Sequence, residues 1–398
     1  MRVLHLITTL SVGGAEQMLV KLLRALDQRA FEPTVVTLVD EGPLIEVIRS
    51  MGIRVETLGL QRGAISVRGL ARLTRIISRT KPELIQSWMY HANLAASLAR
   101  PWTPRKTPII WNIRQSLYEL SRERLLTRAV VHSGKYFAPH VDAIINNAHS
   151  SQQQHAAIGY RNARNVVIPN GFEIDRFRPD PTARVSVRRE IGIPEDAVVI
   201  GMAARMHPLK DHANFLRASK TALLADPRLH FVLVGRDTDT HALVLDAASN
   251  GLRGRLHSLG ERADMPRVLN AFDVLVSASR GEGCPNVVGE AMSCGVRVVG
   301  TNVGDTANVI GNCGEVVAPE NSALLADAML SVAGQSSAIG FTMSDAARER
   351  IRTHYSIETI AKQYTDLWEG AIAQRGGNPP TRDSASPLPE THQVMHAR

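Results

Sequence analysis

The strongest constraint on the fold is an alternation of short apolar runs and amphipathic stretches, which the chain completes twice. The first series predicts strands at residues 3–7, 34–38, 55–58, 84–86, 109–112, 143–146 and 166–168. The second predicts strands at 198–202, 231–234, 256–259, 274–276 and 298–300. Apolar residues at helical spacing lie between them. Strands that alternate with helices form buried parallel sheets. We therefore predict an α/β protein with two Rossmann-like parallel-sheet domains.

Turn-forming residues separate the two series. Pro169-Asn170-Gly171 ends the first, and a proline-rich stretch at 178–181 follows. We therefore predict a first domain at 1–175 and a second at 176–355. The apolar pattern at 357–373 predicts a last helix within 356–374. Residues 375–398 are polar and rich in Gly and Pro, which predicts a disordered tail.

The composition indicates a soluble, cytoplasmic protein. Hydrophobic residues make up 44% of the 398 positions, and no apolar run approaches the roughly 18 residues needed to cross a bilayer. The short apolar stretch at 3–7 leads into glycines and not into a cleavage site, so we interpret it as a strand and not a signal peptide. Three cysteines, Cys284, Cys294 and Cys313, indicate reduced thiols.

The positive charge is concentrated in the first half. Residues 1–170 contain 22 Lys and Arg against 11 Asp and Glu, whereas the remainder contains 24 against 27. This excess suits an anionic membrane surface, and equally a solvated basic face. Nucleic-acid binding is disfavoured because only 5% of residues are aromatic and able to stack bases.

Two glutamates follow a predicted strand in the second series. Glu282 lies in the glycine-rich run 279–285, and Glu290 lies one turn into a helix predicted from Asn286. Loops at the carboxyl ends of parallel strands line the ligand crevice of such sheets. Carboxylates suit sugar hydroxyls, and the free amides of the helix start suit an anion.

Two cations follow an earlier strand of the same series. Arg205 and Lys210 lie five residues apart in a strand-to-helix loop. A bidentate guanidinium and an ammonium can together hold a pyrophosphate. We predict that these two side chains form such a clamp.

Two further features lie in the first half. Gly13 and Gly14 follow the first strand and allow close approach of a phosphate, or form an ordinary turn. His91 is predicted near a helix start at the carboxyl end of a strand, where a neutral imidazole can contact a reacting hydroxyl or phosphate.

An Asp-x-Asp motif, Asp237 and Asp239, follows Gly235 and Arg236. Such spacing can hold a divalent metal. The Arg205 and Lys210 clamp already neutralises a diphosphate, so we predict no metal ion and no cofactor, and interpret Arg236 and Asp237 as the rim of the crevice.

These motifs together resemble the group-one, retaining nucleotide-sugar glycosyltransferases of family four, which have the GT-B architecture. The resemblance covers residues 3–368 and rests on segments in the family's order: 13–16, 168–172, Arg205 with Lys210, 234–235, and Glu282 with Glu290. It implies two domains that face each other across a cleft, with the last helix crossing back to the first domain.

The resemblance also implies roles for individual residues. Arg205 and Lys210 would neutralise the departing diphosphate, Glu290 would bind the ribose, and Glu282 and His91 would face the transferred sugar. Turn 259–262 would border the nucleobase. The predicted catalytic residues are His91, Glu282, Arg205 and Lys210. The predicted donor-binding residues are Gly13, Gly14, Arg205, Lys210, Gly235, Arg236, Gly260, Glu261, Arg262, Glu282, Gly283, Cys284, Pro285, Asn286, Val287 and Glu290.

One position departs from the family pattern, which commonly has an aromatic residue where Cys284 stands. The smaller side chain widens the pocket and leaves the donor sugar undetermined. Family members use UDP-linked or GDP-linked donors, and we favour UDP. They commonly retain the anomeric configuration by a front-face route that relies on positioning and electrostatics.

We expect the acceptor to meet the first domain. Arg122, Arg124, Arg128 and Lys135 share a stretch with Leu125 and Leu126, and a cationic amphipathic segment can lie on an anionic bilayer. We predict a lipid-linked saccharide acceptor and peripheral association with the cytoplasmic membrane face. Packing of the same stripe against the sheet is the alternative. The alternative functions are a UDP-sugar epimerase of this architecture and a non-catalytic nucleotide-sugar-binding module.

Overall fold

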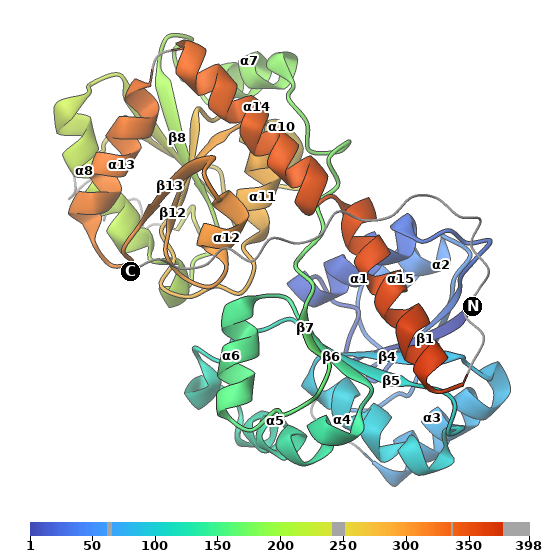
Figure 1. Cartoon of the computed structure of the whole chain (residues 1–398). Coiled ribbons are helices and arrows are strands. Elements are labelled where there is room, and N and C mark those ends of the chain that lie inside the picture. The colour runs from blue at the N-terminus through green and yellow to red at the C-terminus, as the bar shows by residue number, and fades with distance from the viewer. Residues whose placement is uncertain (62–65, 241–250, 336, 377–398) are drawn as a thin grey trace.

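The structure is a computed structural model that describes residues 1–61, 66–240, 251–335 and 337–376. These residues form two parallel sheets that lie in separate lobes (Figure 1). The seven-stranded sheet has the order β3-β2-β1-β4-β5-β6-β7, and the six-stranded sheet has the order β10-β9-β8-β11-β12-β13. The predicted fold class is thus confirmed.

The first sheet is built from residues 2–167. Its strands are β1 (Arg2–Ile7), β2 (Glu32–Thr37), β3 (Arg54–Thr57), β4 (Leu84–Trp88), β5 (Ile109–Ile113), β6 (Ala143–Asn146) and β7 (Asn165–Val167). Its helices are α1 (Gly14–Ala25), α2 (Leu44–Arg49), α3 (Val67–Thr80), α4 (Tyr90–Leu98), α5 (Leu125–Phe137) and α6 (His149–Ala157). Short 3₁₀ turns occupy Arg100–Trp102, Leu120–Arg122 and Ala138–His140.

The second sheet is built from residues 198–317. Its strands are β8 (Val198–Ala203), β9 (Leu229–Val234), β10 (Leu256–Ser258), β11 (Val274–Ser277), β12 (Arg297–Thr301) and β13 (Gly314–Val317). The helices of this half are α7 (Pro181–Glu190), α8 (His212–Ala225), α10 (Met265–Asn270), α11 (Asn286–Ser293), α12 (Thr306–Ile310), α13 (Ser322–Gly334) and α14 (Ser337–His354). A 3₁₀ turn at Pro208–Lys210 precedes α8.

Every strand that the pattern predicts is present, and one strand was missed. The missed strand is β13, which pairs with β12 at the edge of the second sheet. Gly314 and Glu315 interrupt its apolar run, and its residues are only partly buried. An edge strand of this kind lacks the continuous apolar signature of a central parallel strand.

The last helix, α15 (Ile357–Gln374), returns to the first domain, as predicted (Figure 1). Its side chains Ile360, Tyr364 and Trp368 are buried in the same apolar cluster as residues of β1, β4 and α1. The indole of Trp368 donates a hydrogen bond to the buried Gln86 side chain of β4. Burial of a large apolar side chain contributes roughly 1.5–3 kcal/mol, so α15 is part of the first core.

The chain crosses between the lobes twice, and the two crossings lie side by side. Phe172 N donates to Tyr355 O at 2.8 Å, and Ile357 N donates to Phe172 O at 2.9 Å. The predicted boundary near residue 175 falls between the end of β7 and the start of α7.

The predicted tail begins at Arg375, whose guanidinium lies 2.5 Å from the Asp142 carboxylate. Residues 377–398 of this tail lie outside the described residues.

Candidate active site between the two sheets

A cavity of about 330 Å³ lies between the two domains. Seven of the predicted donor-binding residues line it: Gly14, Arg205, Lys210, Glu282, Gly283, Cys284 and Asn286. Because the carboxyl ends of parallel strands meet at one edge of each sheet, loops after β1, β8 and β11 converge here. The structure therefore brings seven of the sixteen predicted donor-binding residues together in one cavity, among them three of the four predicted catalytic residues.

Glu282 and Lys210 form an ion pair in this cavity. The Lys210 ammonium donates to Glu282 Oε1, which also accepts from Ser279 Oγ at 2.7 Å. The Lys210 side chain is 27% exposed and the Glu282 side chain is 12% exposed. The pair gives Lys210 a fixed position while the second oxygen of Glu282 remains able to accept a hydrogen bond from a ligand hydroxyl.

The loop that carries Lys210 is held in place by hydrogen bonds of Asp211 and Arg280. Asp211 adopts a left-handed backbone conformation with φ of 51° and caps α8 by accepting from Asn214 N. Its buried carboxylate also accepts from Arg280 Nε at 2.7 Å. Arg280 N in turn donates to Leu209 O at 2.8 Å. These contacts tie the loop after β8 to the loop after β11.

Arg205 and His207 lie on the same loop. Arg205 is exposed and forms no ion pair with any residue that the structure describes. His207 Nε2 lies 3.5 Å from Glu119 Oε2 of the first domain. Burial, followed by the charge of Arg205, lowers the pKa of His207. A neutral imidazole is thus favoured beside a free guanidinium.

The first domain adds cavity residues that were not among the predicted site residues, namely Arg114, Gln115, Ser116, Tyr118, Glu119, Asn147 and Asn170. Ser116 Oγ donates to the backbone carbonyl of Glu282 at 3.0 Å. Asn170 Nδ2 donates to Cys284 O at 3.1 Å and to Asn286 Oδ1 at 2.7 Å. Residues 114–116 follow β5 and Asn147 follows β6, so the rule that strand ends line the crevice could have found them.

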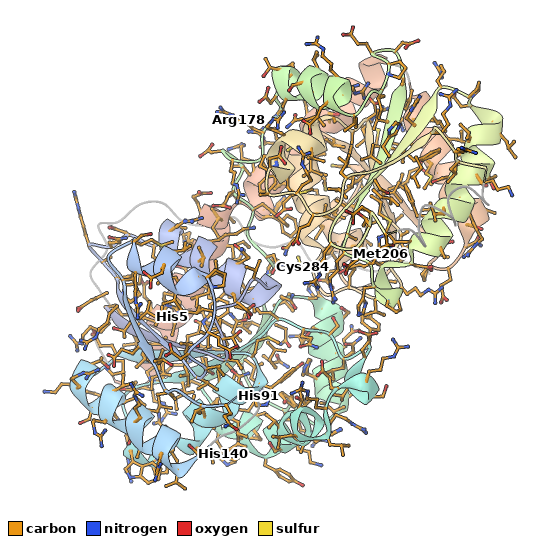
Figure 2. All side chains as sticks on the ribbon, turned by 180° about the vertical axis from the view of Figure 1, so that it is seen from behind. His5, His91, His140, Arg178, Met206 and Cys284 are labelled. Atoms are coloured by element: carbon orange, nitrogen blue, oxygen red, sulfur yellow. The ribbon has the colours of Figure 1, made fainter. Side chains whose placement is uncertain are left out.

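Cys284, the residue that departs from the family pattern, is buried between the lobes (Figure 2). It belongs to the same buried apolar cluster as Val288 of α11 and Phe172, which lies between β7 and α7. Burial raises the pKa of its thiol to about 11. The side chain is therefore a neutral thiol that forms part of the wall of the cavity.

Glu290 lies in α11 and faces Lys21 of α1 across the domain interface. The carboxylate and ammonium are 3.7 Å apart, and the Glu290 side chain is 18% exposed. Burial raises the pKa of Glu290, and Lys21 partly opposes this effect. Glu290 does not line the cavity that contains Glu282.

His91 lines a different cavity, of about 360 Å³, with Thr8, Thr9, Ser11 and Glu123. Figure 2 shows it inside the first lobe, whereas Cys284 lies at the junction of the lobes. Helix α4 begins at Tyr90, after Met89 with φ of 70°, so His91 lies in its first turn, as predicted. Burial lowers the pKa of His91, which keeps its imidazole neutral. The structure does not place His91 beside Glu282.

The predicted nucleobase turn lies outside the cavity. Gly235 N donates to Gly260 O at 2.8 Å, which joins the turns after β9 and β10. Arg236 and Glu261 are exposed. Arg262 instead pairs with Glu190 at 2.6 Å and Asp264 at 2.7 Å, so its charge is already compensated.

The remaining predicted residues surround the helix starts. Gly13 is the N-cap of α1 and Pro285 is the N-cap of α11, whose first turn contains Val287. Asp237 and Asp239 are both exposed. Among the residues that the structure describes, no group of three or more His, Cys, Asp or Glu could hold a metal ion.

Both halves of the chain match family models. Residues 12–176 match Glycosyltransferase Family 4, and residues 197–335 match Glycosyl transferases group 1. The chain belongs to the family-four, group 1 glycosyltransferases. The resemblance inferred from the motifs is thus confirmed.

Curated relatives match this family member over part of their length. It is 31% identical over 140 residues to the UDP-Gal:alpha-D-GlcNAc-diphosphoundecaprenol alpha-1,3-galactosyltransferase of Escherichia coli, a match that covers 34% of this chain and 36% of that protein. It is 26% identical over 279 residues to the lipopolysaccharide core biosynthesis mannosyltransferase LpsB of Rhizobium meliloti, covering 67% and 74%. The chain matches three of these curated relatives over only 35–38% of their length.

Solved structures share the whole architecture. HepE from Anabaena in complex with UDP superposes with a TM-score of 0.79 at 22% identity, covering 93% of this chain and all of that one. A sucrose-phosphate synthase from Thermosynechococcus elongatus superposes with a TM-score of 0.75 at 16% identity, covering 94% and 100%. At these identities the likeness establishes the GT-B fold.

Among the helices that the structure describes, none combines the length and the apolar composition that a membrane span requires.

Proposed function

We propose that this protein is a retaining glycosyltransferase that moves a hexose or N-acetylhexosamine from a nucleotide-diphosphate sugar to an acceptor hydroxyl without a metal ion. The observation that carries the proposal is the interdomain cavity in which the Lys210–Glu282 pair lies beside Arg205. Cations suit the diphosphate, and a fixed carboxylate suits sugar hydroxyls.

In the proposed reaction, the acceptor oxygen bonds to the anomeric carbon as the bond from that carbon to the phosphate oxygen breaks. The departing phosphate takes the acceptor proton on the same face of the sugar. Arg205 and Lys210 stabilise the charge that develops on the phosphate, and Glu282 orients the sugar. Catalysis of this kind rests on positioning and electrostatics.

We favour UDP as the nucleotide. The Escherichia coli relative is named for UDP-Gal as its donor, and HepE was crystallised with UDP and with UDP-glucose. The name of the same relative specifies a diphosphoundecaprenol-linked acceptor. These names support a UDP-sugar donor and a lipid-linked saccharide acceptor for this chain.

Helix α5 supports a membrane-facing acceptor site. Leu125, Leu126 and Tyr136 are 79%, 55% and 68% exposed. Exposed Arg124 and Lys135 accompany them, while Val130 and Val131 pack inward. Exposed apolar side chains beside cations suit an anionic lipid surface. We propose that α5 rests on the cytoplasmic face of a membrane.

Nucleotide binding tests the proposed transfer. UDP, GDP and ADP are each added to the purified protein with and without EDTA, and the melting temperature is measured. We expect UDP to raise it equally in both conditions, because a ligand that binds only the native state stabilises it. Lys210→Ala should abolish the shift, and Lys220→Ala, an exposed lysine on α8, should keep it. No shift with any nucleotide would contradict the proposed nucleotide-sugar donor. A shift that is lost with EDTA would refute metal independence.

Vesicle binding tests the membrane proposal. The protein is sedimented with vesicles of anionic or of zwitterionic lipid. We expect binding to the anionic vesicles only, and at least a tenfold loss in the double variant Leu125→Ser, Leu126→Ser. Leu224→Ser, which changes an 83% exposed leucine on the second domain, is the control. Equal binding of the double variant and the wild type would contradict the role of α5.

A further inference from the structure

Arg114 is a buried cation in the wall of the interdomain cavity. It follows β5, lines the cavity and is 9% exposed. Its Nη1 donates to Tyr364 Oη at 2.7 Å and to Asn112 Oδ1 at 3.4 Å, and its Nη2 donates to Asn170 Oδ1. All three acceptors are neutral. The side chain is therefore held in place by hydrogen-bond partners that carry no negative charge.

Within the described residues, no carboxylate forms an ion pair with Arg114. The cavity contains two carboxylates, and both already face other groups: Glu282 pairs with Lys210, and Glu119 lies beside His207. The Arg114 Nε is also buried without a hydrogen-bond partner. The Trp88 ring, 5.9 Å from the guanidinium carbon, gives partial compensation.

A buried charge without a counter-ion is costly unless a partner supplies the opposite charge. Arg205, the other cavity cation without an ion pair, is exposed to water and does not carry this cost. Arg114 is thus the group whose environment most requires an anion from outside the chain.

The contacts of Arg114 place it on the donor side of the cavity. Its partner Asn170 also donates to Cys284 O and to the Asn286 side chain. Asn286 begins α11 and lies beside Gly14, the first residue of α1, since a Cβ on Gly14 would be 4.0 Å from Asn286 Nδ2. Arg114 therefore adjoins the turn that follows Glu282.

We propose that Arg114 binds an anionic oxygen of the donor from the first-domain side, and so makes negative charge on the donor a condition of tight binding. The proposal rests on the proposed transferase function. The anion is either the diphosphate or the carboxylate of a transferred hexose that is oxidised to a uronic acid, since a guanidinium donates hydrogen bonds to both.

Calorimetric titration tests the proposal through a ratio of affinities. UDP and uridine are titrated into the wild type, Arg114→Gln and Tyr364→Phe. We expect Arg114→Gln to lower the UDP affinity about 10- to 100-fold and the uridine affinity less than twofold, because a hydrogen bond to a charged group is lost. Tyr364→Phe removes a partner of Arg114 and no charge, so its UDP-to-uridine ratio should equal that of the wild type.

Two further ligands distinguish the source of the anion. If Arg114→Gln weakens UDP-glucuronate and leaves UDP and UDP-glucose unchanged, the anion is the sugar carboxylate. If none of the three ligands is weakened, the proposal is wrong. Failure of the wild type to bind any of them would instead refute the transferase function. If Arg114→Gln does not fold, Arg114→Lys is used instead, because it replaces the guanidinium group by a single nitrogen. The affinities of this variant for UDP and for UDP-glucuronate are each divided by its affinity for uridine. The proposal requires at least one of these two ratios to be threefold or more below that of the wild type.

Discussion

At the scale of single residues, Gly304 shows how the backbone shapes the site. It has a φ of 58°, and a Cβ added there would lie 2.5 Å from the carbonyl oxygens of Glu282 and Gly283. The neighbouring Asp305 N donates to Gly283 O at 2.8 Å. The loop after β12 therefore supports the turn that carries Glu282, and only glycine fits at the point of contact.

We expect Gly304→Ala to displace this turn. The left-handed conformation alone costs about 1–2 kcal/mol for alanine, and the steric clash adds about 1–3 kcal/mol. The thermal midpoint should fall by several degrees, and the UDP affinity should fall with it. Gly192→Ala is the matched control, because Gly192 has a φ of 71° and open space around its Cβ position. Equal losses of midpoint and UDP affinity in the two variants would show that the contact with the Glu282 turn is unimportant.

At the scale of elements, the start of α6 is capped from the opposite domain. The Asp305 carboxylate accepts from His149 N at 2.9 Å and from Ser150 N at 3.3 Å, and it lies 2.8 Å from His149 Nδ1. Asp305 is 4% exposed. The free amides of this helix start therefore bind a carboxylate of the protein itself. The contact fastens the second domain to the first beside the cavity.

We expect Asp305→Ala to weaken this connection. Loss of an N-cap carboxylate costs about 0.5–2 kcal/mol, so the thermal midpoint should fall by a few degrees. The KM for the nucleotide sugar should rise as well, because the cavity is formed by both domains. Asp327→Ala, at an exposed position on α13, should change neither value. A fall in midpoint at constant KM would restrict the role of Asp305 to stability.

At the scale of the whole molecule, buried histidines link stability to pH. Burial lowers the pKa of His5 to about 3 and that of His155 to about 4. The pKa of His230 is also lowered to about 4, first by burial and then by His257. His155 Nδ1 faces Ser151 O at 2.7 Å, so this nitrogen carries the proton, and Nε2 accepts from Tyr90 Oη. The fold therefore requires the neutral ring.

Because burial lowers the pKa values of these histidines, the folded protein loses stability at acidic pH. As the pH is lowered, the histidines of the unfolded chain bind protons from about pH 6.5, whereas those of the folded protein do so only near pH 4. The free energy of unfolding therefore decreases as the pH falls from about 6.5 to about 4. We expect the thermal midpoint to fall from pH 7 to pH 4.5. The fall should be smaller in His155→Gln, which cannot titrate, and unchanged in His140→Gln, at an exposed position. Identical pH profiles for all three proteins would contradict the role of His155.

The sequence by itself determined the class of fold and half of the site. Alternating apolar runs identify a parallel α/β topology because central strands are buried on both faces. The rule that ligands meet the carboxyl ends of strands then selected Arg205, Lys210 and Glu282, which line one cavity. Short local spacing is sufficient here, since each of these residues is placed by the strand directly before it.

The tertiary structure alone decided the contacts between distant segments. Arg114 meets Tyr364 across 250 residues, and Asp305 meets His149 across 156. Arg262 is neutralised by Glu190, although the turn around it predicts a ligand contact. His91 lines a different cavity, with Thr8 and Thr9 after β1 and residues of α5, and not the cavity that contains Glu282. Such contacts depend on how the two domains and α15 pack together, and no local pattern in the sequence encodes that packing.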